Sequence, residues 1–186
     1  MAERLKGRNI AILATHGFEQ SELTEPKRLL EAEGARVSVV SPAKEATIKG
    51  WKDKNWGDVV AVDIPLDEAD PARFDALVLP GGVINPDTLR THETALAFIR
   101  ALDEAGKPVA AICHGPWLLI NSGLAKGRER TSWPSLQQDL ANAGASWRDA
   151  EVVVDGNLIT SRKPDDIPAF SDRLISRVLE KVPENA

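Results

Sequence analysis

Short apolar runs alternate with longer segments in which apolar residues recur every three or four positions, and this alternation continues along almost the whole chain. The apolar runs at residues 9–14, 36–40, 75–79 and 109–113 each have the length and composition of a buried strand. Strands of nearly continuous apolar residues are typical of parallel sheets that are buried on both faces. We therefore predict an α/β fold with a parallel sheet covered by helices, in which ligands bind beyond the carboxyl ends of the strands.

The first helix is expected to end near residues 32–33, with Gly34 just beyond it as the C′ residue. Its start is open between two candidate caps. If Ser21 caps the helix, Pro26 lies deep enough to kink it, whereas Thr24 as cap places Pro26 in the first turn, where proline is tolerated.

Further helices are expected after the later strands. They cover residues 95–102, where apolar side chains share one face and Gly106 ends the helix, residues 117–119 after Gly115-Pro116, and residues 134–143 and 168–182. Residues 46–65 contain two β-like pieces around a polar loop at 51–58, which we interpret as a β excursion outside the main sheet. Asp155-Gly156 lies between apolar pieces at 152–154 and 158–160, which is typical of a hairpin.

Length and composition narrow the class of protein. The 186 residues predict a single domain over residues 1–186. A formal net charge of −5 with mixed signs argues against a nucleic-acid partner, which requires a basic surface. No apolar run reaches the roughly 18–20 residues of a membrane span, and the N-terminus lacks the apolar core of a signal peptide. We therefore expect no membrane association.

Cys113 is the only cysteine of the chain. A single cysteine rules out an intrachain disulfide and a metal site built from several thiolates. It also favours the reducing environment of the cytoplasm. From the sequence we expect neither a cofactor nor a bound metal.

Reactive residue types gather where three of the predicted strands end, at residues 15–19, 79–82 and 111–116, which should meet at one edge of the sheet. Cys113 is the centre of this group, because it lies at a sharp turn between an apolar strand and a helix that opens with Gly115-Pro116. The N-terminus of that helix would favour the thiolate, which is the nucleophilic form of cysteine. The alternative is a small buried residue that only fills space at a strand end.

Four residues near Cys113 could complete a catalytic set. Glu19, after the first strand, could donate a hydrogen bond to the sulfur if it is protonated, or it could only stabilise a helix start. His114 could take the thiol proton as a general base, or it could be a packing histidine. The N–H groups of Gly81, Gly82 and His114 could form an oxyanion hole, although a Gly-Gly pair alone is more typical of an ordinary turn.

The histidines are His16, His92 and His114, so none follows residue 114. Cysteine hydrolases on this kind of sheet often take their base from a late loop, and here that loop cannot supply one.

Five strings of the sequence resemble the PfpI family. They are LVLPGGV (77–83), NPDTLR (85–90), GKPVAAICHGPWLL (106–119), TSWPSLQQDLANAGA (131–145) and DAEVVVDGNLITSRKPDDIPAF (149–170). This family is a branch of the class I glutamine amidotransferase-like superfamily, which also contains the parkinsonism-associated deglycase. The resemblance extends over roughly residues 8–182.

The resemblance implies a flavodoxin-like three-layer α/β sandwich with a nucleophile elbow at Cys113. It implies that Glu19 touches Cys113, because the string GFEQSEL (17–23) matches the pattern of the family. It also implies a triad-like set of Cys113, His114 and an acid from a neighbouring subunit, matched by Glu93, since members of the family assemble as dimers and hexamers.

The leading hypothesis is a cysteine-dependent hydrolase or lyase of the stress response, with deglycase-like or glyoxalase-like activity on reactive carbonyls or their adducts. Cys113 would attack and His114 would move the proton. One alternative is an intracellular cysteine peptidase, and another is a redox-sensing or chaperone-like protein in which Cys113 is oxidised. Glutaminase chemistry is not expected, because the downstream histidine of true amidotransferases is missing.

Overall fold

A seven-stranded sheet forms the centre of the protein in a computed structural model, which describes residues 3–180. Its strands lie in the order β11-β12-β8-β7-β1-β3-β6. All neighbouring strands are parallel except the β11–β12 pair. Their bounds are β1 (Asn9–Leu13), β3 (Arg36–Ser41), β6 (Ile64–Pro65), β7 (Ala76–Leu79), β8 (Val109–Ile112), β11 (Val153–Asp155) and β12 (Leu158–Ser161). The four strands expected from the apolar runs are all confirmed within one or two residues.

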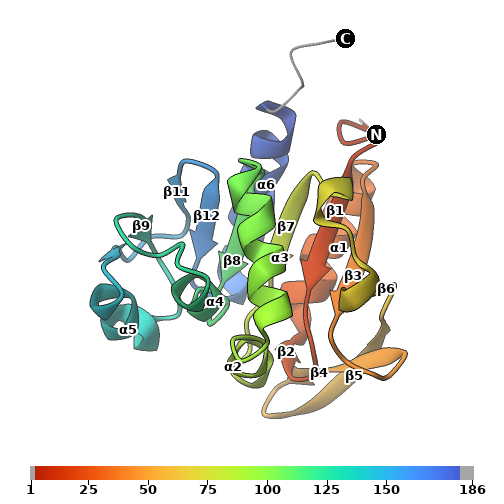
Figure 1. Ribbon diagram of the computed structural model, residues 1–186, viewed down its shortest axis with the longest axis horizontal. Helices are drawn as coiled ribbons and strands as arrows, with labels where there is room; N and C mark the ends of the chain where they lie inside the picture. The colour runs from red at the N-terminus through yellow and green to blue at the C-terminus, as the bar shows by residue number, and fades with distance from the viewer. Residues whose placement is uncertain (1–2, 181–186) are drawn as a thin grey trace.

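Helices cover both faces of this sheet (Figure 1). On one face, α1 (Gln20–Ala32) and α6 (Ile167–Glu180) pack with Ile10 and Ile12 of β1. On the other face, α3 (Glu93–Glu104) and α4 (Trp117–Asn121) pack with Ala11 and Leu13. Alternate residues of one strand therefore enter two separate cores, which explains why the strand is apolar at every position. The α/β architecture with a mainly parallel sheet is confirmed.

The β excursion expected at residues 46–65 forms a separate three-stranded sheet, in the order β2-β4-β5. Its strands are β2 (Phe18–Glu19), β4 (Thr47–Lys52) and β5 (Asn55–Ala61), and it lies near the carboxyl ends of the main strands (Figure 1). The prediction of a polar loop over residues 51–58 is wrong, because only Asp53 and Lys54 form a turn and the other residues belong to β4 and β5. Both turn residues have positive φ angles, +50° and +64°, so a two-residue hairpin turn joins the strands directly.

Helix α1 begins earlier than either candidate cap predicts. Glu19 is its N-cap residue and has extended backbone angles, because it also pairs with β4 as the last residue of β2. Neither Ser21 nor Thr24 caps the helix, and Pro26 lies inside it on the buried side. The end of the helix at Ala32 agrees with the prediction.

Several smaller elements differ from the expectation. The segment 134–143 divides into a 3₁₀ turn, η3 (Pro134–Leu136), and α5 (Gln137–Asn142). The expected C-terminal helix begins at Ile167, and its expected last residues lie outside the described part of the chain. Elements that the pattern did not predict are β2, the main-sheet strand β6, α2 (Ile84–Leu89), β9 (Glu129–Arg130), β10 (Ser146–Trp147), η1 (Leu66–Glu68), η2 (Pro71–Arg73) and η4 (Pro164–Asp166). Across residues 3–180, no helix combines the length and apolar character that crossing a membrane requires.

Candidate active site

Cys113 lies immediately after β8, four residues before the start of α4. Its φ angle is +63°, and the only other described non-glycine residues with positive φ are Asp53 and Lys54 of the hairpin turn. A left-handed conformation is unfavourable for a residue with a Cβ atom, and such strain is concentrated at functional sites. The strand-to-helix turn therefore holds Cys113 in a conformation that its own backbone preference does not explain.

Three kinds of group surround the Cys113 sulfur. The imidazole of His114 places Nδ1 at 3.3 Å from Sγ. The backbone N–H groups of Gly82 and His114 and the carboxyl group of Glu22 lie beside the sulfur and influence its pKa. A thiol, an imidazole and a carboxyl group consequently meet at one point on the carboxyl edge of the sheet.

The carboxyl group at the sulfur belongs to Glu22, so the expected contact between Glu19 and Cys113 is wrong. Glu22 is fully buried, and its Oε1 accepts a hydrogen bond of 3.0 Å from the N–H of Gly81. Glu19 lies one helical turn earlier, is half-buried, and lines the same pocket. One signal in the sequence could have found Glu22, because it lies four residues before Pro26 and eight before Leu30, on the buried face of α1.

Burial is the main cause that raises the pKa of Glu22 to about 8, and the negative charge of Glu19 contributes to this rise. Glu22 therefore carries its proton at pH 7. In that state its unpartnered oxygen Oε2 can carry the proton and offer it toward the sulfur, which is the role that the sequence analysis assigned to Glu19. Burial also raises the pKa of Glu19 itself, together with the charge of Asp53.

Burial raises the pKa of the Cys113 thiol, and ionisation of Glu22 raises it further. The N–H groups of Gly82 and His114 act in the opposite direction but are weaker. Burial therefore opposes the thiolate that the sequence analysis expected near neutral pH. That expectation relied on a helix dipole, yet α4 has only five residues and starts at Trp117, too short and too distant to offset burial.

His114 is suited to take the thiol proton. Burial lowers its pKa, so its imidazole is neutral at pH 7, and Nδ1 faces the sulfur. Its ring lies between two indoles, with the Trp117 ring at 5.1 Å edge-on and the Trp133 ring at 6.1 Å in a stacked orientation. Trp117 is held in turn by a hydrogen bond of 2.9 Å to Asp139. These contacts fix the imidazole without a charged partner from the same chain.

We expect alkylation of Cys113 by iodoacetamide to show a pH midpoint above the value of about 8.5 that is typical of a free thiol. Burial and the Glu22 carboxyl group both oppose the thiolate. Because Cys113 is the only cysteine, mass spectrometry of the intact protein reads this one site, and the urea-unfolded protein serves as the reference. A folded-state midpoint below that of the unfolded protein would contradict this prediction.

One of the three N–H groups expected to form an oxyanion hole, that of Gly81, is already bound within the protein. Gly81 donates its N–H to Glu22, so this group is not free to bind a substrate oxygen. The N–H groups of Gly82 and His114 lie beside the sulfur, and their role as oxyanion-hole donors stays a prediction. Gly81 has a packing reason to be glycine, because a Cβ atom there would lie 2.6 Å from Glu22 Oε1 and 2.7 Å from the Cys113 Cβ.

Glu93 lies apart from this group within the chain. Its side chain is 75% exposed at the start of α3, and it forms an ion pair with Arg100 of the same helix. Among the described residues it makes no hydrogen bond to His114. The proposed contact of Glu93 with His114 thus requires a second subunit, as the sequence analysis expected, and stays a prediction.

A pocket of about 540 Å³ opens above Cys113. It is lined by Gly17, Glu19, Glu22, Trp51, Asp53, Lys54, Gly82, Val83, Ile84, Cys113, His114, Trp133 and Pro164. Its walls come from the main sheet, from the β4–β5 hairpin and from α2. Within residues 3–180, no group of three or more His, Cys, Asp and Glu side chains is arranged to hold a metal ion.

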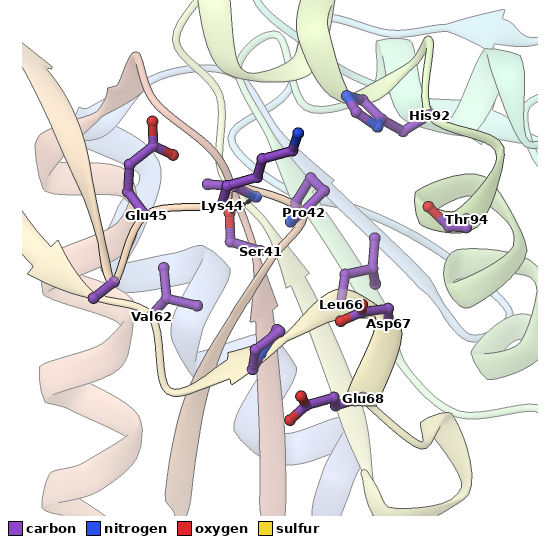
Figure 2. A pocket seen from close by; sticks show the side chains of 13 residues that line it. Ser41, Pro42, Lys44, Glu45, Val62, Leu66, Asp67, Glu68, His92 and Thr94 are labelled. Atoms are coloured by element: carbon purple, nitrogen blue, oxygen red, sulfur yellow. Dashed lines mark hydrogen bonds between the residues drawn. The ribbon is translucent and has the colours of Figure 1, made fainter.

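A larger hollow of about 720 Å³ lies beyond the ends of β3 and β6, beside the start of α3. Figure 2 shows charged side chains of both signs around it, including Lys44, Glu45, Asp67 and Glu68, with His92 across the opening. Among its described lining residues, no serine or threonine hydroxyl is hydrogen-bonded to a histidine, a lysine or a carboxylate. The pocket at Cys113 is therefore the candidate active site.

Comparisons with known proteins show the family to which the chain belongs. Residues 8–177 match the DJ-1/PfpI family. The chain is 47% identical over 161 residues to "Deglycase TK1284" of Thermococcus kodakarensis, covering 87% of this chain and 93% of that protein. It is 43% identical over 176 residues to "General stress protein 18" of Bacillus subtilis, covering 94% and 99%. The crystal structure of Drosophila melanogaster DJ-1beta superimposes with a TM-score of 0.85 at 28% identity, covering 97% of this chain and 92% of that one. The chain therefore belongs to the DJ-1/PfpI family.

Proposed function

We propose that this protein is a cysteine-dependent stress-response enzyme that converts reactive α-oxoaldehydes, or their adducts on amines and thiols, to 2-hydroxy acids. The observation that carries the proposal is the 3.3 Å contact between Cys113 Sγ and His114 Nδ1 at the base of a pocket. The strand-to-helix turn with positive φ at Cys113 has the geometry of a nucleophile elbow. Similarity to proteins named as a deglycase and a general stress protein supports the same conclusion.

The reaction begins when Cys113 Sγ adds to the aldehyde carbon and His114 Nδ1 takes the thiol proton. The imidazolium returns this proton to the new alkoxide oxygen, which gives a hemithioacetal. In an adduct, the same carbon carries the amine or thiol, so the C–S bond forms as that leaving group departs with a proton. Neutral imidazole is present to start each cycle, because burial lowers the pKa of His114.

The hemithioacetal is isomerised in the next step. The proton bound to its carbon moves to the neighbouring carbonyl carbon, and the hydroxyl proton moves to the neighbouring oxygen, which gives the thioester of a 2-hydroxy acid. Water then cleaves the C–S bond, releasing the acid and restoring the thiol. We assign to the N–H groups of Gly82 and His114, which lie beside the sulfur, the stabilisation of negative charge on the substrate oxygen. Glu22, which is protonated at pH 7, can offer a further hydrogen bond there, because its Oε2 has no partner within the protein.

The proposal is tested by incubating the protein with methylglyoxal, and separately with a methylglyoxal-treated N-acetylated amino acid, and quantifying lactate. We expect lactate from both, with release of the free amino acid derivative from the adduct. Cleavage of a peptide substrate without lactate would replace this function by peptidase activity. A mass increase of two oxygen atoms on Cys113 under peroxide, with no turnover of either carbonyl, would assign a redox role instead.

We further propose that the enzyme is a cytoplasmic homo-oligomer in which Glu93 of one subunit orients His114 of another. Glu93 lies between His92 and Thr94, which both line the larger hollow of Figure 2, so a second subunit that reaches Glu93 would cover this hollow. An orienting carboxylate fixes the tautomer of a catalytic histidine. The exposure of the Glu93 side chain supports this role.

A Glu93→Gln variant is then expected to lose tenfold or more of its turnover, since an orienting acid contributes up to about 10⁴-fold to a catalytic histidine. Its melting temperature should change little, because surface ion pairs stabilise proteins by only about 0–1 kcal/mol. Glu104→Gln, at the opposite end of α3, is the matched control. Specific activity that survives dilution to the monomer would show that His114 needs no carboxylate from a partner.

A further inference from the structure

We propose that the substrates of this site carry a bulky apolar group, such as an aromatic ring, beside the reactive carbonyl. This inference rests on the proposed function and names the substrate class within it. The pocket at Cys113 divides into a polar base and an apolar mouth, and the apolar mouth is the part that the chemistry of the reaction does not use.

Exposed apolar side chains lie at the mouth of the Cys113 pocket. Five large hydrophobic residues are exposed within residues 3–180, and three of them line this pocket: Val83, Ile84 and Trp133. Their exposed fractions are 54%, 41% and 40%. Exposed apolar side chains gathered around a concave site are typical of ligand binding. A substrate with an apolar substituent would cover them when its carbonyl reaches the sulfur.

Trp133 is fixed next to the nucleophile. Its backbone N–H donates a hydrogen bond of 2.9 Å to the carbonyl oxygen of Cys113, and its ring stacks on His114. The backbone oxygen of Trp133 accepts a hydrogen bond of 2.8 Å from Ser132, whose Oγ in turn accepts one of 3.0 Å from Trp147. The indole therefore presents a fixed flat surface beside the reacting atoms, on which a second ring can stack.

The size of the pocket agrees with a large substituent. A three-carbon oxoaldehyde has five non-hydrogen atoms and occupies about 150 Å³ when each water-sized group is taken as about 30 Å³. The pocket measures about 540 Å³. Most of this space would stay filled with water if methylglyoxal alone were the substrate, and that water would lie against Val83, Ile84 and Trp133.

The charged residues of the pocket lie at the hairpin side. Glu19 and Asp53 are acidic, and Lys54 is the single basic residue of the lining. Glu22 is neutral at pH 7 because burial raises its pKa to about 8. The lining therefore carries a net negative charge at neutral pH, which disfavours an anionic substituent and leaves an uncharged apolar one as the best match.

The test uses two alkylating agents with the same reactive group, phenacyl bromide and bromoacetone. In both, Cys113 Sγ forms a bond to the methylene carbon, bromide leaves, and the thiol proton passes to solvent through His114. Rates are measured by intact-protein mass spectrometry and divided by the rates with a small free thiol. We expect this normalised ratio to favour the phenyl compound by at least tenfold, and to fall at least fivefold in Trp133→Ala.

A matched pair of variants separates the pocket from the rest of the surface. Val83→Ala should lower the ratio, whereas Val59→Ala should not, because Val59 has a similar exposure of 58% but lies outside this pocket. A ratio near one in the wild-type protein, or an equal ratio in Trp133→Ala, would overturn the inference. Because alkylation needs no turnover, this result is independent of lactate formation, whose absence would overturn the proposed function instead.

Discussion

A Glu22→Gln variant is expected to be more stable than the wild-type protein at pH 8 by about 4 kcal/mol, and equally stable near pH 4.5. Glu22 is fully buried, and its pKa is raised from 4.5 to about 8 mainly by burial. The glutamine side chain has nearly the same shape, and its carbonyl oxygen can still accept the hydrogen bond from Gly81. The comparison therefore isolates the cost of a buried ionisable group.

The sign follows from the protons bound in each state. Between pH 4.5 and pH 8 the unfolded wild-type chain has released the Glu22 proton, while the folded protein retains it. Each pH unit in this window lowers the free energy of unfolding by up to about 1.4 kcal/mol. The part of the wild-type stability that depends on the Glu22 proton, about 4 kcal/mol, is thus fully present below pH 4.5 and is lost as the pH rises toward 8. The variant has no proton to release at this position.

Urea unfolding of both proteins at several pH values between 4.5 and 8 measures the difference. Glu25→Gln is the control, because Glu25 lies on the same helix and pairs with Arg28 at the surface. Its stability should follow that of the wild type across the whole range. Parallel stability curves for the wild type and Glu22→Gln would contradict a buried, proton-carrying Glu22.

The fold was predictable because the apolar residues of the strands indicate directly that these strands are buried. Each central strand is apolar at successive positions, as at Ile10, Ala11 and Ile12, since its two faces enter two different cores. The apolar stripe of α3 was equally clear, with Phe98 and Ile99 buried against the sheet. Local patterns of this kind depend on the periodicity of one element and need no knowledge of its neighbours.

The parts of the site that were not predicted depend on contacts between elements. The identity of the acid at the sulfur depends on which side of α1 faces the sheet, and this follows from where the helix starts. The pairing of β2 with β4 starts the helix at Gln20, so Glu22 points inward and Glu19 stays at the mouth of the pocket. The state of the Cys113 thiol likewise depends on burial by surrounding elements, which no short motif encodes.

Replacing Cys113 with alanine is expected to lower carbonyl turnover by about 10³-fold or more, because no other thiol can form the hemithioacetal. His114→Gln should lower turnover by about 10²- to 10⁴-fold, the usual contribution of a general base. Lactate formation from methylglyoxal measures both effects. Circular dichroism and thermal unfolding show whether each variant keeps its fold.

The double variant distinguishes a catalytic pair from two separate contributions. If His114 acts only by taking the Cys113 proton across the 3.3 Å contact, its removal has no further effect once the sulfur is gone. Turnover of the double variant should then equal that of Cys113→Ala. A further loss from His114→Gln in the Cys113→Ala background would mean that His114 also acts on the substrate independently of the sulfur.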